Sequence, residues 1–289
     1  MSPPLRFGIV RNQNLPLADL LRHWGFFETL GFDSLWQADH YQRPSVPDLP
    51  FLEGWTLLAA MATKTERVRI GVLVTSNTFR HPALVAKQAV TVDHISGGRL
   101  ELGMGTGWWE PEHRAYGVEF PEPKELVDRF AEAIALIDAL LRDDPATYDG
   151  QHYHLRDAQF RPRPINGTIP LTMGAHGPRM LRLAARYADR WNSHGTADEL
   201  RERNTRLDEA CAARGRDPRE ITRSLYGWTL KLGLDPWSSL DAFAEMVGCY
   251  REAGISEFLV EAPHERQFAT TERIARELIP KLRAEASEM

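Results

Sequence analysis

RVRIGVLVTSNTFRHPALVAKQAVTVDHISGGRLELGMGTG, residues 67–107, is the stretch that decides the fold. Its first part, 67–75, is an apolar run typical of a buried strand, and 98–107 is a second such run. Between them, 81–98 has the length and spacing of a helix that ends on a glycine pair. Two buried strands joined by a helix form a right-handed parallel crossover, so the stretch predicts a β–α–β unit of an α/β protein.

The same alternation continues in both directions along the chain. Eight strands alternating with helices favour a closed TIM (β/α)8 barrel over an open sheet, and no G-x-G-x-x-G follows the first strand. We expect one barrel domain over 1–289, with an insertion after the fourth strand–helix unit at about 144–168, where Pro, Gly and polar residues are frequent and a small hairpin is possible. The other expected strands are 5–10, 32–37, 169–174, 188–194, 223–233 and 257–261, and the other expected helices run from Pro16 to Gly31 and over 54–65, 124–142, 177–188, 198–214, 239–253 and 270–284.

Composition indicates a globular protein that acts on small molecules. Of 289 residues, 43% are hydrophobic, enough for a sizeable core, and the net charge of −5 is spread among mixed charges, which argues against nucleic-acid or membrane surfaces. Cys211 and Cys249 lie far apart, so neither a disulfide framework nor a thiolate metal site is indicated. No signal sequence or membrane span is recognisable, and we expect a cytoplasmic protein.

Reactive side chains follow several of the expected strands. FDSLWQADH, residues 32–40, ends in Asp39 and His40, and in barrels of this kind the chemistry lies at the C-terminal ends of the strands. The alternative is that Asp39 caps a turn and His40 is an ordinary rim residue. GMGTGWW, residues 103–109, places glycines within a strand, which indicates close approach by a flat ligand or another backbone. The alternative is tight layering of side chains inside the barrel.

MGAHGPRM, residues 173–180, is a strand that enters a glycine-containing turn and then a helix. Free N–H groups at such a helix start favour an anion such as phosphate. A glycine-rich turn before any helix would look much the same.

Together these motifs resemble a known family. DSLWQADH (33–40), RHPALVAKQAVTVDHISGGRLELGMGTGW (80–108), HRAYGVEFP (113–121), YDGQHYHLRDAQFRPRP (148–164) and MGAHGPRMLRLAARYADRWN (173–192) look like successive motifs of the bacterial luciferase-like monooxygenase superfamily, particularly its deazaflavin-dependent oxidoreductases. The resemblance extends from the first strand to about residue 195. It implies a TIM barrel with an insertion, a coenzyme at the C-terminal rim, either F420 or flavin mononucleotide (FMN), and a homodimer.

The resemblance also implies a set of site residues. Asp39 and His40 would be the catalytic pair beside the coenzyme ring, with His40 polarising or deprotonating the substrate. Leu73 and Val74, joined by a cis peptide, would form a bulge behind the ring. The ring edge would follow Thr106 and Gly107, and the turn near the phosphate would comprise Gly174, Ala175, His176 and Gly177.

One departure from the family bears on the substrate. Deazaflavin-dependent sugar-phosphate dehydrogenases of the family carry a Glu directly after the Thr-Gly, whereas here Trp108 and Trp109 follow, with Glu110 behind them. This argues against a sugar phosphate. We expect Trp36, Trp108, Trp109 and Trp191 to border a pocket for an apolar or aromatic substrate, with plain core packing as the alternative for Trp36 or Trp191.

Four hypotheses of function remain open at this point. The first is an oxidoreductase that moves a hydride between coenzyme F420 and a small organic substrate, and the second is an FMN-dependent monooxygenase that uses O2 and a partner reductase. A third is a metal-dependent barrel enzyme, although no H-x-H or H-E-x-x-H spacing supports one. A fourth is a non-catalytic coenzyme-binding protein. The metal ligands of the third hypothesis would be Asp39, His40, His81, His113 and His176.

Overall fold

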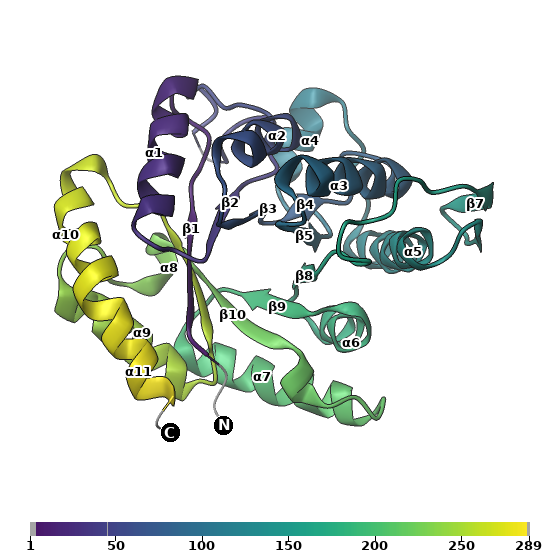
Figure 1. Ribbon diagram of the computed structural model, residues 1–289. Helices are drawn as coiled ribbons and strands as arrows, with labels where there is room; N and C mark the ends of the chain where they lie inside the picture. Colours follow the sequence, from purple (N-terminus) through teal and green to yellow (C-terminus); the bar gives the residue numbers. More distant parts are fainter. Residues whose placement is uncertain (1–3, 45, 288–289) are drawn as a thin grey trace. The chain divides into compact units, whose positions relative to one another are not determined.

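The computed structural model describes residues 4–44 and 46–287 and comprises two compact units (Figure 1). Unit 1 contains the described residues of Met1–Asn12, Leu21–Trp36 and Ala175–Met289, and unit 2 contains those of Gln13–Leu20 and Gln37–Gly174. Each unit is built from parallel strands and the helices that follow them.

The strands of unit 1 are neighbours in the order β2 (Ser34–Gln37), β1 (Arg6–Val10), β11 (Glu257–Glu261), β10 (Thr222–Gly227) and β9 (Arg190–Ser193). β1 pairs in parallel with β2 and β11. β10 pairs with β11 and with β9, again in parallel. Residues on both faces of these strands are buried, as expected for strands that read as continuous apolar runs.

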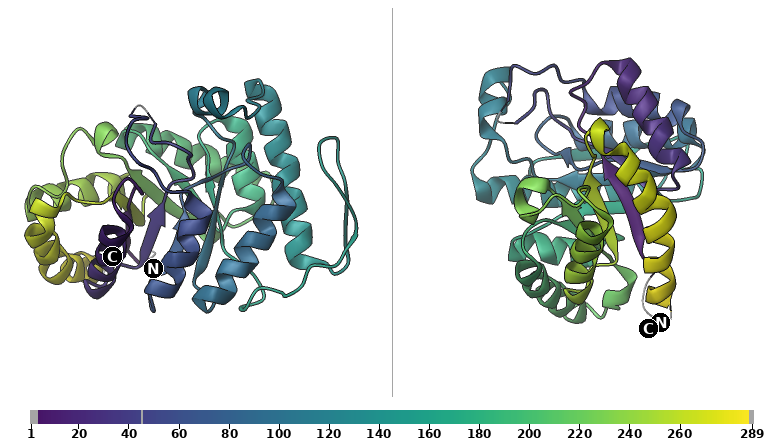
Figure 2. Two further views of the ribbon diagram at one scale, coloured as in Figure 1. Left: turned by 90° about the horizontal axis from the view of Figure 1, so that it is seen from above. Right: turned by 90° about the vertical axis from the view of Figure 1, so that its left-hand side faces the viewer.

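The helices of unit 1 follow its strands. Figure 1 shows the last three helical segments as one continuous rod, and Figure 2 shows its C-terminal part beside β1, where Arg283 donates to the carbonyl of Leu5 and to Asp33. The helices are α1 (Leu17–Thr29), which begins in unit 2, α6 (Pro178–Tyr187), α7 (Ala197–Ala212), α8 (Thr229–Leu232), α9 (Leu240–Glu252), α10 (Phe268–Arg273), a π-helical segment (Ile274–Leu278) and α11 (Ile279–Ser287), with 3-10 turns at Pro218–Glu220 and Glu265–Gln267.

Unit 2 contains the rest of the strands. β5 (Leu100–Gly105) pairs in parallel with β3 (Arg69–Val72), β4 (Thr75–Ser76) and β8 (Leu171–Gly174). Its helices are α2 (Gly54–Lys64), α3 (Pro82–Ser96), α4 (Glu110–Tyr116) and α5 (Pro123–Arg142). If β3 and β4 count as one interrupted strand, the described residues contain the eight strands that alternate with helices in the sequence.

The expected excursion at 144–168 contains a hairpin. β6 (Ala146–Asp149) and β7 (His154–Ala158) are antiparallel and extend away from α5 (Figure 2). Their connection is tied back to α5, because Glu132 accepts the backbone N–H groups of residues 151–153.

Four local expectations need correction. The strand expected at 67–75 is interrupted after Val72, where the Leu73–Val74 peptide is cis as the resemblance implied. The strand expected at 223–233 ends at Gly227, because the chain turns into α8. The helix expected at 270–284 begins earlier and contains the π segment. α4 was not expected at all.

Within the described residues, no helix combines the length and hydropathy needed to cross a bilayer.

Candidate active site

Asp39 lies two residues after β2 and is 4% exposed. Its carboxylate accepts two hydrogen bonds from Arg80, at 2.6 and 3.0 Å, and one from the backbone N–H of Ser76 at 2.8 Å. A bidentate Arg–carboxylate pair fixes both partners in one plane. Asp39 therefore holds the segment after β4 against the end of β2.

His40 points its Nδ1 at the carboxylate of Glu112, at 2.7 Å. Glu112 is fully buried, and its other oxygen accepts the backbone N–H groups of Tyr41 and Gln42. A buried carboxylate on Nδ1 keeps the hydrogen on that nitrogen, as it does in the triads of hydrolases. Nε2 is thus the nitrogen of His40 that remains for a ligand, and the side chain is 14% exposed.

Glu112 comes from α4, which the sequence reasoning missed. The signal was present, since Pro111 stands in the first turn of the helix and Gly117, at a φ of 68°, ends it. The neighbouring residue, His113, is 1% exposed and is used internally: its Nδ1 donates to the carbonyl of Trp109, and its Nε2 lies 2.6 Å from the hydroxyl of Thr78.

The glycines of β5 leave room for the end of β3 and the residues between β3 and β4 to pack closely against this strand. A Cβ at Gly103 would lie 2.0 Å from the carbonyl oxygen of Val72, and one at Gly105 would lie 2.5 Å from Val74 Cγ2. Neither space could accept a side chain, so these two glycines are explained by close packing of protein atoms: the Val72 backbone at Gly103 and the Val74 side chain at Gly105. The site residue Gly174, at the end of β8, faces the same Val74 side chain at 3.4 Å.

Thr106 and Gly107 follow β5 directly. Gly107 has a φ of 88° and lies so close to Ser76 and Thr78 that a Cβ would be 2.7 and 2.9 Å from their hydroxyl oxygens. The positive φ and the lack of space both require glycine here.

The four tryptophans expected at the pocket divide into two pairs. Trp108 is 55% exposed and lies edge-on to the His40 ring at 5.8 Å, with Trp109 next to it at 5.0 Å. Trp36 and Trp191 are fully buried, and their indole N–H groups donate to Ser34 and to the carbonyl of Ala175. Trp108 is thus the tryptophan in ring contact with His40, and Trp109 packs against Trp108.

The turn after β8 belongs to unit 1 from Ala175 onward. Gly177 is the N-cap of α6, without a side-chain cap, and a Cβ there would meet nothing within 4 Å. The ring of His176 lies 4.5 Å from that of His194. Burial lowers the pKa of His176 to about 4, helped by the nearby charges of His194 and Arg203, so its imidazole is neutral at pH 7.

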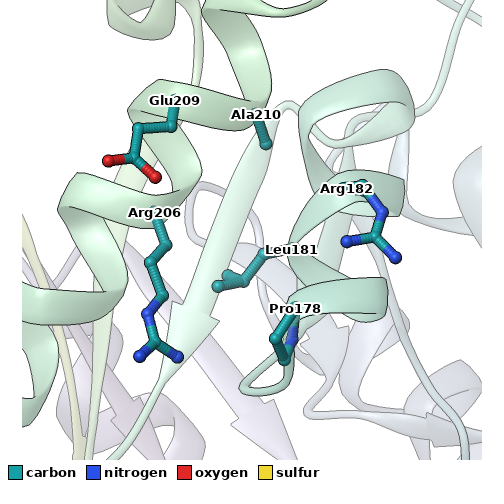
Figure 3. A pocket seen from close by; sticks show the side chains of 6 residues that line it. All are labelled: Pro178, Leu181, Arg182, Arg206, Glu209 and Ala210. Atoms are coloured by element: carbon teal, nitrogen blue, oxygen red, sulfur yellow. The ribbon is translucent and has the colours of Figure 1, made fainter.

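The charges around this turn are mixed. α6 carries arginines and no acidic residue, and a hollow of about 380 Å³ lies between α6 and α7 (Figure 3). Arg182 and Arg206 stand on its two sides with Leu181 between them, but Glu209 also lines it and Arg206 is paired with Glu202. The positive charge that an anion near the start of α6 would meet therefore comes from α6 itself.

A metal centre gains no support from the geometry. Within the ranges described, no three His, Cys, Asp or Glu side chains come together as ligands for an ion. Asp39 and His113, two of the candidate ligands, are instead engaged with protein partners.

Comparison with known proteins identifies the family. Residues 4–230 match the luciferase-like monooxygenase family. The chain belongs to this family. An F420-dependent glucose-6-phosphate dehydrogenase of Beutenbergia cavernae is 31% identical over 92% of this chain and 94% of its own length. A 5,10-methylenetetrahydromethanopterin reductase of Archaeoglobus fulgidus is 32% identical over 65% of this chain and 52% of its own.

Solved structures show the fold. An F420-dependent secondary alcohol dehydrogenase, solved with an F420–acetone adduct, superposes with a TM-score of 0.83 over 95% of this chain and 98% of its own, at 20% identity. The expected parallel (β/α)8 barrel is thus confirmed.

Proposed function

We propose that this protein is an oxidoreductase that transfers a hydride between coenzyme F420 and a small organic substrate. The relative that aligns along nearly the whole chain is F420-dependent. When bound, the deazaflavin supplies the carbon that accepts or donates the hydride. An FMN-dependent monooxygenase with a partner reductase is the less supported alternative, resting on the family description.

The residues at the strand ends fit such a coenzyme. Thr75, directly after the Leu73–Val74 peptide, is fully buried, and its hydroxyl oxygen has no partner within the described residues. A ring that presents a polar edge there would satisfy it. On the side of the phosphate, the open space at Gly177 and the basic α6 suit an anion. Leu73, Val74, Thr106 and Gly107 would hold the ring, and Gly174, Ala175, His176 and Gly177 the phosphate.

The observation that carries the proposal is the His40–Glu112 pair. In the direction of alcohol oxidation, Nε2 of His40 takes the hydroxyl proton while the hydride leaves the carbon. The resulting imidazolium is stabilised by the Glu112 carboxylate at 2.7 Å from Nδ1. In the direction of reduction, the same nitrogen returns the proton. Asp39 orients this end of β2 rather than exchanging protons, because its oxygens are occupied by Arg80 and Ser76.

We infer that the substrate is apolar or aromatic. Trp108 leaves more than half of its surface exposed beside His40, and a large indole face favours an apolar body. The homologous dehydrogenase is named for glucose 6-phosphate. The family resemblance implies an acid directly after the Thr-Gly in sugar-phosphate dehydrogenases, whereas Trp108 and Trp109 follow Thr106–Gly107 here.

The wider setting is also proposed. The two units would work as one barrel domain, the protein would form a homodimer, as the resemblance implies, and it would act in the cytoplasm on a small molecule without nucleic-acid or membrane partners. Size-exclusion chromatography with light scattering tests the dimer.

Titration with both coenzymes tests the function. Purified protein is titrated with F420 and with FMN, binding is followed by fluorescence, and the F420-loaded protein is then screened with secondary alcohols and ketones. We expect F420 to bind at least tenfold more tightly and its absorbance to change on turnover. Tight FMN binding with no response to F420 would instead establish the monooxygenase.

A further inference from the structure

A cavity of about 280 Å³ in unit 2 borders the candidate active site, with which it shares Thr78 and Arg80, and extends away from it toward α5. Asn77, Phe79 and His81, from the segment after β4, form one side of it. The other sides are α5 and the connection between β6 and β7. These contribute Leu126, Arg129 and Tyr153. The cavity is smaller than most drug-sized sites but large enough for a single-ring molecule.

The charges around this cavity are already neutralised by protein partners. Arg129 binds Glu119 at 2.9 Å and Glu125 at 2.7 Å. Arg80, which also borders the cavity, is held by Asp39. A charged ligand would meet no unpaired opposite charge here and would lose its hydration. An uncharged ligand is therefore favoured.

Asn77 provides an unused acceptor. It is 5% exposed, and its Oδ1 has no hydrogen-bond partner in the described part of the chain. Its Nδ2 reaches only the phenol oxygen of Tyr153, at 3.5 Å. A buried carbonyl without a partner is costly, and an N–H donor from a ligand would remove that cost.

His81 provides a matching donor. Its Nδ1 accepts the backbone N–H of Ala83 at 3.1 Å as the N-cap of α3, so the hydrogen of the neutral ring is on Nε2. Burial lowers the pKa of His81, which keeps the ring neutral at pH 7. The ring meets Tyr153 edge-on at 5.3 Å. An acceptor, a donor and aromatic walls thus surround one space.

We propose that this cavity is a second binding site, separate from the substrate site at His40, for a small uncharged molecule that carries an amide on an aromatic body. The amide N–H group binds Asn77 Oδ1, its carbonyl accepts from the His81 ring, and the aromatic body packs between Phe79, Leu126 and Tyr153. Because the 76–80 segment also holds Asp39 through Ser76 and Arg80, the occupant touches the same segment that orients the end of β2.

Benzamide is the probe, compared with acetophenone, benzoate and toluene. Ligand-observed NMR titrations of the wild-type protein, at saturating F420 and without it, give a dissociation constant for each. We expect benzamide to bind at least fivefold more tightly than each of the others and to be unaffected by F420. Equal binding of benzamide, acetophenone and toluene would overturn the amide assignment. Displacement of benzamide by F420 would show that the cavity belongs to the coenzyme site, which also overturns the proposal.

Two variants locate the probe. Asn77→Ala should reduce the ratio of acetophenone to benzamide dissociation constants to about one, whereas Asn204→Ala, a matched change at a buried asparagine of unit 1, should leave it unchanged. A crystal soaked in benzamide should show the amide at Asn77. Water alone at Asn77, with benzamide bound elsewhere or nowhere, would overturn the proposal without relying on either variant.

Discussion

Two histidines that follow parallel strands have opposite surroundings. His40, after β2, faces the buried carboxylate of Glu112, whereas His176, after β8, faces the ring of His194 with Arg203 nearby. A carboxylate stabilises a positive imidazole, and a second imidazole beside a guanidinium opposes one. Identical residues at equivalent strand ends are thus prepared for different work: His40 to hold a proton during a reaction, and His176 to remain neutral in the turn proposed for the phosphate.

The largest expected effect comes from removing the proton-handling ring. His40→Ala should lower kcat by about 10²–10⁴, the usual range for a lost general acid or base, while F420 affinity changes little. Stopped-flow absorbance and a fluorescence titration measure the two quantities. Full turnover in this variant would show that His40 does not carry the proton in the reaction.

Glu112→Gln tests whether the carboxylate beside His40 matters, because glutamine keeps the shape of the side chain and removes its negative charge. We expect kcat to fall by about 10- to 100-fold, the range for losing a partner that orients a metal-bound histidine, with KM nearly constant. Glu110→Gln, an exposed acid on the same short helix, is the control and should retain activity.

The phosphate turn should respond through binding instead. Gly177→Asp places a negative charge at the start of α6 and should weaken F420 binding by about 100-fold. Gly177→Ala is the matched control, since its Cβ would meet nothing within 4 Å. Equal affinities of the two variants would show that no anion binds there.

Trp108 should affect substrate choice alone. Trp108→Ala should raise KM for an aromatic alcohol about tenfold, because a large apolar contact is lost, while kcat stays within a factor of two. An aliphatic alcohol of similar reactivity serves as the comparison substrate. If KM rises equally for both, Trp108 does not select aromatic bodies.

The smallest effect concerns acid stability. The pKa of His176 is about 4 in the folded chain against 6.5 for an ordinary histidine, so the unfolded chain binds more protons between these values. The contribution of neutral His176 to the free energy of unfolding is therefore fully present above about pH 6.5 and is lost as the pH falls toward 4. His176→Gln should reduce this loss by about 1–2 kcal/mol in urea unfolding at pH 5 against pH 7. His154→Gln, a matched change at an exposed site, should leave the loss of stability between pH 7 and pH 5 as it is in the wild-type protein.

The sequence predicts the fold well because helical and strand periods are local properties. It says less about the site, because the decisive contact joins His40 to a residue 72 positions away, and no local pattern encodes that pair. Pro111 and Gly117 mark a helix between them, but its seven residues are too few for a periodic signal. The cis peptide at Leu73–Val74 was expected from the family resemblance alone. The sequence also did not separate the buried Trp36 from the exposed Trp108. Trp36 lies in a strand that is buried on both faces, and such a strand has no alternation of polar and apolar residues to show which side chains face a pocket.

α4 has a consequence for engineering a new substrate range. Trp108 contacts His40 only by its ring and stands just before the helix, so a saturation library at this position samples pocket shapes without disturbing the proton-handling pair. Trp109 differs, because its backbone carbonyl accepts from His113 and begins the helix. Side chains at 109 are open to variation, but a deletion in the loop before the helix would displace Glu112 and lower activity however well the new pocket fits its substrate.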